Sequence, residues 1–175
     1  SWKGQEMFIE ALNLVNQELK QEVFNAVILG DAQGRDVYKK KLLRLVEQYR
    51  LNKQVKFVDH CTHMPLAYKI SNLVVSSSIE PEAFGKVSVE AQSMEKLIIA
   101  SNIGGSNETI INDKTGLLFE SGKPKSLSQK IIEALKLNDS TLKIMGNEGR
   151  KNVIKKFNIE KMCFSTYSEY KKLIN

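Results

Sequence analysis

The feature that most constrains this chain is an alternation between short apolar runs rich in β-branched residues and longer segments with helical spacing. Five short segments have the composition of buried strands: 23–29, 55–58, 72–76, 97–100 and 116–119. The segments with helical spacing are 5–19, 38–49, 64–70, 86–94, a short turn over 106–111, and a region from 127 to the end that is interrupted near 138–140 and 157–158. Strands that alternate with helices predict a parallel sheet with helices on both faces. Right-handed crossovers then give an α/β, doubly wound, Rossmann-like fold.

The length of the chain, 175 residues, is that of one domain with a core of its own. No apolar run approaches the roughly 18 residues that a membrane span needs, and no signal segment opens the sequence. Because the chain begins Ser1-Trp2-Lys3-Gly4, without an initiator Met, we expect it to be a piece of a longer polypeptide. Cys61 and Cys163 lie too far apart in sequence to indicate a disulfide framework, so a cytoplasmic protein is expected.

The net charge of +6 requires an explanation. A basic surface suits nucleic acid, an anionic membrane or a phosphate-bearing ligand. Aromatic residues are not interleaved with the lysines as nucleic-acid stacking platforms require, so we expect no nucleic acid partner. A phosphate-bearing ligand fits the charge, and a peripheral contact with anionic lipid at the inner face of the membrane is a further hypothesis.

Ligands of doubly wound sheets bind beyond the carboxyl ends of the strands. Three loops are therefore candidates for the site: Gly30-Asp31, Ser76 to Gly85, and Ala100 to Ser106.

The segment 76–91 is the most informative of these, since it begins where a strand ends and finishes inside a helix. Gly85 lies where that helix begins, and a glycine lets the backbone approach a ligand closely. The next amides, those of Lys86 and Val87, point out of the helix end. Free amides and the helix dipole together form an anion site that suits a diphosphate.

Two carboxylates, Glu82 and Glu90, are separated by seven residues across this loop-to-helix junction. Glu90 lies just over one turn inside the helix and can face the same crevice. A carboxylate there can accept two hydrogen bonds from a vicinal diol such as that of a ribose. The alternative is that both are solvated charges flanking a helix start, where Glu is favourable.

The Glu-x7-Glu run with its internal Phe-Gly closely resembles the signature of retaining nucleotide-sugar glycosyltransferases of family 4 (group 1), which have the two-domain GT-B fold. The resemblance extends over essentially the whole chain. Four further segments match the family in order and spacing: the Lys-Gly at 3–4, the strand end at 28–31, the Gly-Gly segment at 99–108, and the turn and strand at 112–118.

The resemblance implies a role for each matching position. Glu90 would hold the donor ribose, and Glu82 would contact hydroxyls of the transferred sugar. Lys3 would neutralise the leaving diphosphate. The remaining donor-binding positions are backbone contacts to the phosphates, the sugar and the base: Phe84, Gly85, Lys86, Val87, Gly30, Asp59 and His60.

The resemblance also implies how the enzyme works. The partner is a nucleoside-diphosphate sugar, no metal or other cofactor is expected, and the anomeric configuration is retained. The acceptor would be a saccharide or a lipid, as in the synthesis of cell-envelope polysaccharide or lipopolysaccharide, and the amino-terminal domain would supply its cleft. Residues 1–175 would then be the carboxy-terminal half of a GT-B enzyme, inactive by itself.

Two departures from the family pattern stand out. Glu95 and Leu97 occupy positions where the family has Gly and Pro, so we expect an altered turn between helix and strand. The family Arg upstream of Lys3, and the central strand that would carry it, would precede residue 1.

Several alternatives remain. Gly30, Gly104 and Gly105 suit a backbone requirement as well as a ligand contact. The group formed by His60, Cys61 and His63 is too compact for a zinc site, and no second ligand pair follows it. A nucleotide-sugar epimerase or phosphorylase of the same architecture, or a catalytically silent binding module, would share most of these features.

Overall fold

The computed structural model describes residues 2–174 except 21–22, 31–33 and 35, so Asp31 lies outside the described residues. The elements in chain order are α1 (Gln5–Leu19), β1 (Ala26–Leu29), α2 (Asp36–Gln48), β2 (Val55–Val58), α3 (Met64–Ile70), β3 (Leu73–Ser76), α4 (Lys86–Ser93), β4 (Leu97–Ser101), α5 (Ser106–Thr109), β5 (Leu117–Phe119), α6 (Pro124–Leu135), α7 (Asp139–Lys156) and α8 (Ile159–Ile174). All strand pairs are parallel and helices flank them, which confirms the predicted α/β class.

The strands form two ladders. β1 pairs with β2, and β3, β4 and β5 form a three-stranded ladder with β4 in the middle. One continuous sheet was expected, but within the described ranges no backbone ladder joins β1 to β3. The strand predicted over 23–29 is also shorter: β1 begins at Ala26, and its four residues pair one to one with the four residues of β2.

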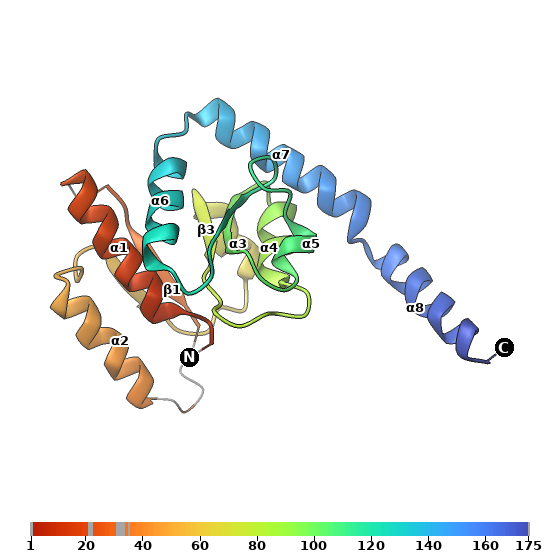
Figure 1. The fold of residues 1–175 in the computed structure, drawn as a ribbon, viewed down its shortest axis with the longest axis horizontal. Coiled ribbons are helices and arrows are strands. Elements are labelled where there is room, and N and C mark those ends of the chain that lie inside the picture. The colour runs from red at the N-terminus through yellow and green to blue at the C-terminus, as the bar shows by residue number, and fades with distance from the viewer. Residues whose placement is uncertain (1, 21–22, 31–33, 35, 175) are drawn as a thin grey trace.

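A shared hydrophobic core unites the two ladders. β4 is buried along its whole length: Leu97 and Ile99 belong to the larger apolar cluster, whereas Ile98 and Ala100 belong to a second cluster that contains Tyr68. This alternation is the pattern of a parallel strand covered on both faces. α1 and α6 lie side by side over the larger cluster (Figure 1). Each fully buried aliphatic side chain contributes about 1.5–3 kcal/mol of burial free energy.

A buried polar network fixes the position of α4 against α7. The side-chain amides of Gln92 and Asn152 both donate to the carbonyl of Thr109, at 2.9 and 3.1 Å. Gly149 allows the close contact, since a Cβ there would lie 3.0 Å from the Gln92 side chain. Because buried amide groups are costly when unpaired, this network specifies where α4 sits.

The turn between α4 and β4 contains the two departures from the family pattern. Glu95 has a φ of 57°, in the left-handed region that glycine adopts without strain. A Cβ on Gly146 of α7 would lie 2.2 Å from the Glu95 carbonyl oxygen, so α7 presses directly on this turn. Leu97 is buried at the start of β4 and pairs with Leu73. The turn thus takes a glycine-like conformation, although glutamate occupies it.

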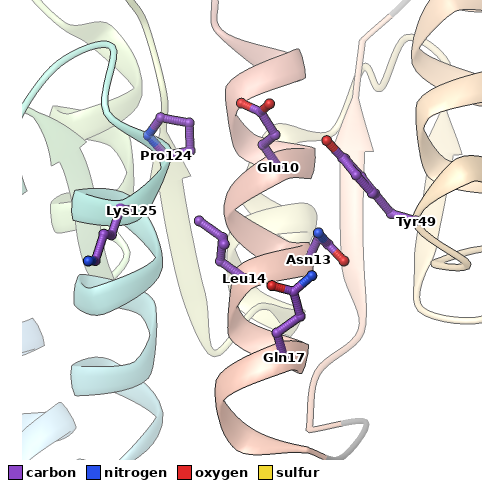
Figure 2. A pocket seen from close by; sticks show the side chains of 7 residues that line it. All are labelled: Glu10, Asn13, Leu14, Gln17, Tyr49, Pro124 and Lys125. Carbon is purple, nitrogen blue, oxygen red and sulfur yellow. The ribbon is translucent and has the colours of Figure 1, made fainter.

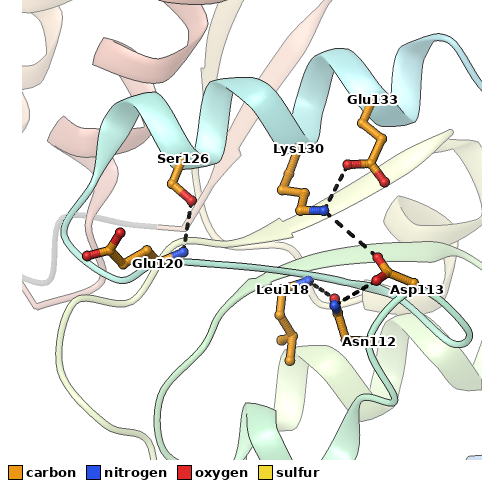
Figure 3. Close-up of polar contacts among 7 residues, drawn as sticks. All are labelled: Asn112, Asp113, Leu118, Glu120, Ser126, Lys130 and Glu133. Atoms are coloured by element: carbon orange, nitrogen blue, oxygen red, sulfur yellow. Dashed lines mark hydrogen bonds and ion pairs between the residues drawn. The ribbon is translucent and has the colours of Figure 1, made fainter.

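Polar contacts brace the segment around β5 and join it to α6 (Figure 3). The amide of Glu120 donates to Ser126 Oγ at 3.0 Å, and Asn112 Oδ1 accepts from the amide of Leu118 at 2.8 Å. Lys130 of α6 lies 3.8 Å from an oxygen of Asp113 in the same turn. These contacts hold the predicted turn at 112–116 against the body of the domain.

α8 differs from the other helices. No residue in it is buried, and it extends away from the body of the domain (Figure 1). Its large apolar side chains are exposed: Ile159, Met162, Phe164, Tyr167, Tyr170, Leu173 and Ile174.

Candidate functional site

The segment before α1 lies against the loop that follows β3. The amide of Ile79 donates to the Trp2 carbonyl at 2.7 Å, and Ser77 Oγ donates to the Lys3 carbonyl at 3.0 Å. Gly4 has a φ of 68°, and a Cβ on it would lie 1.9 Å from the Ser77 carbonyl oxygen. Only glycine fits at this position. The glycine of the Lys-Gly pair is therefore required by backbone packing, apart from its resemblance to the family.

This contact brings Lys3 to Glu82. Lys3 Nζ lies 2.9 Å from Glu82 Oε1 and 4.1 Å from the centroid of the Trp2 ring. Ser78 Oγ donates to the same carboxylate oxygen. Two predicted site residues are therefore direct partners, and sequence reasoning missed Ser78, which lies in the serine run that ends β3.

Partial burial by itself would raise the pKa of the Glu82 carboxyl. The hydrogen bonds from Ser78 and Lys3, with the positive charge of Lys3, outweigh it and hold that pKa below its ordinary value of 4.5. Glu82 is consequently ionised at neutral pH, and an ionised carboxylate only accepts hydrogen bonds, as from sugar hydroxyls.

The Gly-Gly pair supports the loop from Glu82 to Gly85. The amide of Gly105 donates to the Glu82 carbonyl at 2.8 Å. A Cβ on Gly104 would lie 2.6 Å from that carbonyl oxygen, and one on Gly105 would lie 2.4 Å from the carbonyl carbon of Phe84. Both glycines are thus required for the close approach of two backbones, in agreement with the interpretation that they meet a backbone requirement.

The amino-terminal tip of α4 lies at the end of this loop. Gly85 is the N-cap with a φ of 72°, and the first helical bond runs from the amide of Ser88 to the Gly85 carbonyl at 3.0 Å. The amides of Lys86 and Val87 precede that bond, which is the arrangement of an anion site. The Phe84 ring, about half exposed, packs edge-on against Phe157 at 5.7 Å between centroids.

Glu90 lies one turn inside α4 and has different partners from Glu82. Tyr68 Oη donates to Glu90 Oε2 at 2.7 Å, and Lys86 Nζ lies 3.6 Å from Glu90 Oε1. Among the described residues no hydrogen bond or ion pair joins Glu82 to Glu90. Tyr68 was missed because nothing in the sequence relates it to a carboxylate 22 positions away.

The loop expected to hold the base follows β2. The amide of Gly30 donates to the Val58 carbonyl at 2.9 Å, and Gly30 has a φ of 136°, so it meets a backbone requirement at the end of β1. Asp59 is exposed and lies 2.8 Å from Lys39, and His60 is also exposed. Within the described residues no hydrogen bond or ion pair joins these two side chains to Glu82 or Glu90, so their donor-binding role stays a prediction.

The described part of the chain contains no cluster of three or more His, Cys, Asp or Glu side chains that could hold a metal ion. Cys61 and Cys163 are both free thiols. A surface pocket of about 360 Å³ lies elsewhere, between α1, the start of α6 and Tyr49. Figure 2 shows the side chains that line it, and none of the predicted site residues is among them.

Residues 1–152 match the family described as glycosyl transferases group 1. This chain belongs to that family. A relative, the capsular polysaccharide biosynthesis glycosyltransferase CapM of Staphylococcus aureus, is 35% identical over 106 residues, which are 61% of this chain and 27% of the relative.

Solved structures share the fold of this chain. A glycosyltransferase from Rickettsia africae ESF-5 superposes with a TM-score of 0.91 at 32% identity, covering 100% of this chain and 45% of that one. HepE of Anabaena, solved in complex with UDP-glucose, has the same fold at a TM-score of 0.86 and 24% identity, covering 97% of this chain and 46% of that one. The group 1 chain described here thus spans less than half the length of these proteins. None of its described helices is long and apolar enough to cross a membrane.

Proposed function

We propose that this group 1 chain is the donor-binding domain of a retaining glycosyltransferase, which transfers a sugar from a nucleoside-diphosphate sugar to a saccharide or lipid acceptor. The observation that carries the proposal is the ion pair of Lys3 with Glu82 beside the Gly85-opened tip of α4, with Glu90 one turn further along the helix. A cation, helix-end amides and two carboxylates match the chemistry of a diphosphate attached to two sugars.

The backbone amides of Lys86 and Val87 would donate hydrogen bonds to the oxygens of the diphosphate. Lys3 would offset the negative charge that grows on the diphosphate as the glycosidic bond breaks, which is the kind of electrostatic stabilisation that usually dominates such reactions. Donor binding would then draw the Lys3 ammonium from Glu82 toward the phosphates. Glu82, held by Ser78, would remain in place to accept hydrogen bonds from hydroxyls of the transferred sugar.

Glu90 would accept hydrogen bonds from the ribose, and the backbone at 58–60 would contact the base. Because Lys3 and helix-end amides provide positive charge, the proposed reaction needs no metal or other cofactor. HepE, which has the same fold, was solved with UDP-glucose, so UDP is the first nucleotide to test. CapM, by its name, acts in capsular polysaccharide synthesis, which supports an acceptor of the cell envelope.

The partner of this domain would be the rest of its own polypeptide. β1 and β3 each lie at the edge of a parallel ladder, and Val27 of β1 is 55% exposed. A strand preceding Lys3 would pair with both edges and make one continuous sheet. The exposed apolar face of α8 supports a further contact with an amino-terminal domain.

The carboxy-terminal placement and the inactivity of the isolated chain follow from that arrangement, since the acceptor cleft would lie between the two domains. Amide hydrogen exchange would test it: α8 should exchange rapidly in residues 1–175 and become protected in the full-length enzyme. Equal exchange of α8 in both proteins would contradict the placement, with α7 as the internal control.

A peripheral contact with anionic lipid is a separate part of the proposal. The basic surface would bind headgroups without insertion. Co-sedimentation with vesicles should increase with the fraction of anionic lipid and fall with added salt. Binding that is independent of lipid charge would remove this part alone.

The deciding experiment for the function is calorimetric titration of UDP, GDP and ADP into the wild type, Glu90→Gln and a matched control, Glu133→Gln, on the exposed side of α6. One nucleotide should bind more tightly than about 1 mM, with a loss of roughly tenfold in Glu90→Gln and none in the control. No binding by any of the three would overturn the donor-domain proposal.

Activity of the full-length enzyme separates the remaining alternatives. Transfer with retention at the anomeric carbon, followed by NMR of the product, is the expected result. Nucleotide binding without transfer or donor hydrolysis would indicate a silent module, and inversion at a sugar carbon without transfer would indicate an epimerase. Turnover by residues 1–175 alone would contradict the expected need for the second domain.

A further inference from the structure

Tyr68 connects two parts of the proposed donor site that are separate in sequence. It lies in α3, the helix that follows the loop at 58–63, and its hydroxyl bonds the carboxylate of Glu90 on α4 at 2.7 Å. Tyr68 is only 5% exposed and packs in the cluster that includes Ala91 and Ile98. A buried ring packed in an apolar cluster has little freedom, so its hydroxyl is a well-positioned donor.

This bond determines which Glu90 oxygen faces a ligand. Oε2 accepts from Tyr68, whereas Oε1 lies 3.6 Å from the ammonium of Lys86, whose side chain is 83% exposed. A carboxylate with one oxygen bonded to a buried phenol cannot rotate freely. Oε1 thus lies on the side of the exposed Lys86 ammonium, and Lys86 is the first residue of α4, at the tip where the diphosphate is proposed to bind.

The phenol of Tyr68 keeps its proton at neutral pH. Burial, then the hydrogen bond to Glu90, and then the negative charge of Glu90 all raise the pKa of Tyr68 well above its ordinary value of 10. Tyr68 is therefore protonated at neutral pH and can donate its hydrogen bond to Glu90.

We infer that Tyr68 is a positioning residue for ribose recognition: its hydroxyl holds Glu90 so that Oε1 meets the 2′- and 3′-hydroxyls of the donor nucleotide. The inference rests on the proposed function, because it concerns the same nucleotide. It also links α3, and with it the loop proposed to contact the base, to the carboxylate proposed to contact the ribose. Base and ribose recognition would therefore depend on one another.

The test uses the nucleotide that binds most tightly among UDP, GDP and ADP, together with its 2′-deoxy form. Both are titrated into the wild type, Tyr68→Phe, Glu90→Gln and the double variant. Tyr49→Phe, which removes the same atom from a half-buried ring outside the site, is the matched control. Thermal unfolding of each variant shows whether it is folded.

The wild type should prefer the ribonucleotide over the deoxynucleotide by about tenfold, since one hydrogen bond to a charged group is lost. Tyr68→Phe should reduce that preference to about two- to threefold, with little change in deoxynucleotide binding. In the Glu90→Gln background, Tyr68→Phe should have no further effect on the preference, because Tyr68 acts through Glu90. Tyr49→Phe should behave as the wild type.

Other outcomes would overturn the inference. If Tyr68→Phe weakens both nucleotides equally, Tyr68 only supports the fold. If Glu90→Gln abolishes the preference and folded Tyr68→Phe retains it, the proposed function stands and the positioning role of Tyr68 falls. If no nucleotide binds to the wild type, the proposed function itself fails and the inference falls with it.

Discussion

The ammonium group of Lys3 lies 2.9 Å from Oε1 of Glu82, joining residues 79 positions apart in the chain. The same oxygen accepts a hydrogen bond from Ser78. This pair connects the segment before α1 to the loop after β3, at the carboxyl end of the strands where ligands of such folds bind. It is both a structural link and, in the proposed function, the place where a cation passes from a carboxylate to a diphosphate.

The Lys3–Glu82 pair should make stability depend on pH. Because hydrogen bonds from Ser78 and Lys3 outweigh burial and lower the Glu82 pKa in the folded state, its stabilisation is present above the ordinary value of 4.5 and is lost as the pH falls through the folded-state value. Glu82→Gln should cost about 0.5–1 kcal/mol at pH 7, a modest value since Lys3 is partly exposed. Urea unfolding at pH 7 and pH 3 should show the cost shrinking in acid. A pH-independent cost would mean that the charge of Glu82 does not matter.

The contact between Gly105 and Phe84 leaves no space for a methyl group, so Gly105→Ala should destabilise the protein. In Gly105→Ala the new Cβ would lie 2.4 Å from the backbone of Phe84, so the loop before α4 must move. We expect a loss of about 2–3 kcal/mol in unfolding free energy, together with weaker nucleotide binding. Gly122→Ala is the control, since its φ of 73° strains an alanine but nothing lies within 4 Å of the new atom. That variant should lose about 1 kcal/mol and keep nucleotide binding.

Replacement of Glu95 should make the protein more stable. Its φ of 57° strains a glutamate, and Glu95→Gly removes that strain at some cost in chain entropy. The expected gain is about 0.5–1 kcal/mol, measured by urea unfolding. Glu133→Gly, inside α6, should instead lose about 1 kcal/mol, because glycine is unfavourable in a helix. A loss in both variants would show that the ion pair of Glu95 with Arg150 outweighs the strain.

Removal of the buried hydroxyl of Ser88 should also stabilise the protein. Its Oγ has no hydrogen-bond partner in the described part of the chain, and the residue is fully buried in α4. Ser88→Ala should therefore raise the unfolding free energy by about 1 kcal/mol, since an unpaired buried hydroxyl is costly and alanine favours helices. Ser93→Ala, on the same helix, removes a hydroxyl that donates to the Glu90 carbonyl at 2.7 Å. It should give no comparable gain, and equal gains in the two variants would attribute the effect to helix propensity alone.

The sequence by itself determined the local structure and the family. The apolar spacing of 5–19, 55–58 and 64–70 predicted elements whose bounds agree with α1, β2 and α3. Such patterns are set by residues a few positions apart, which the sequence displays directly. The Glu-x7-Glu run likewise indicated a group 1 glycosyltransferase, and the match over residues 1–152 confirms membership of group 1.

Only the tertiary structure decided which of these residues are partners. It paired Lys3 with Glu82, placed the Tyr68 hydroxyl in a hydrogen bond to Glu90, and divided the strands into two ladders. Burial of the shared core brings these distant segments together. Because burial depends on the apolar area removed from water and not on direction, the sequence pattern alone does not show which segments will meet. A hydrogen bond, in contrast, requires its two atoms within about 3 Å, and that placement depends on the whole fold.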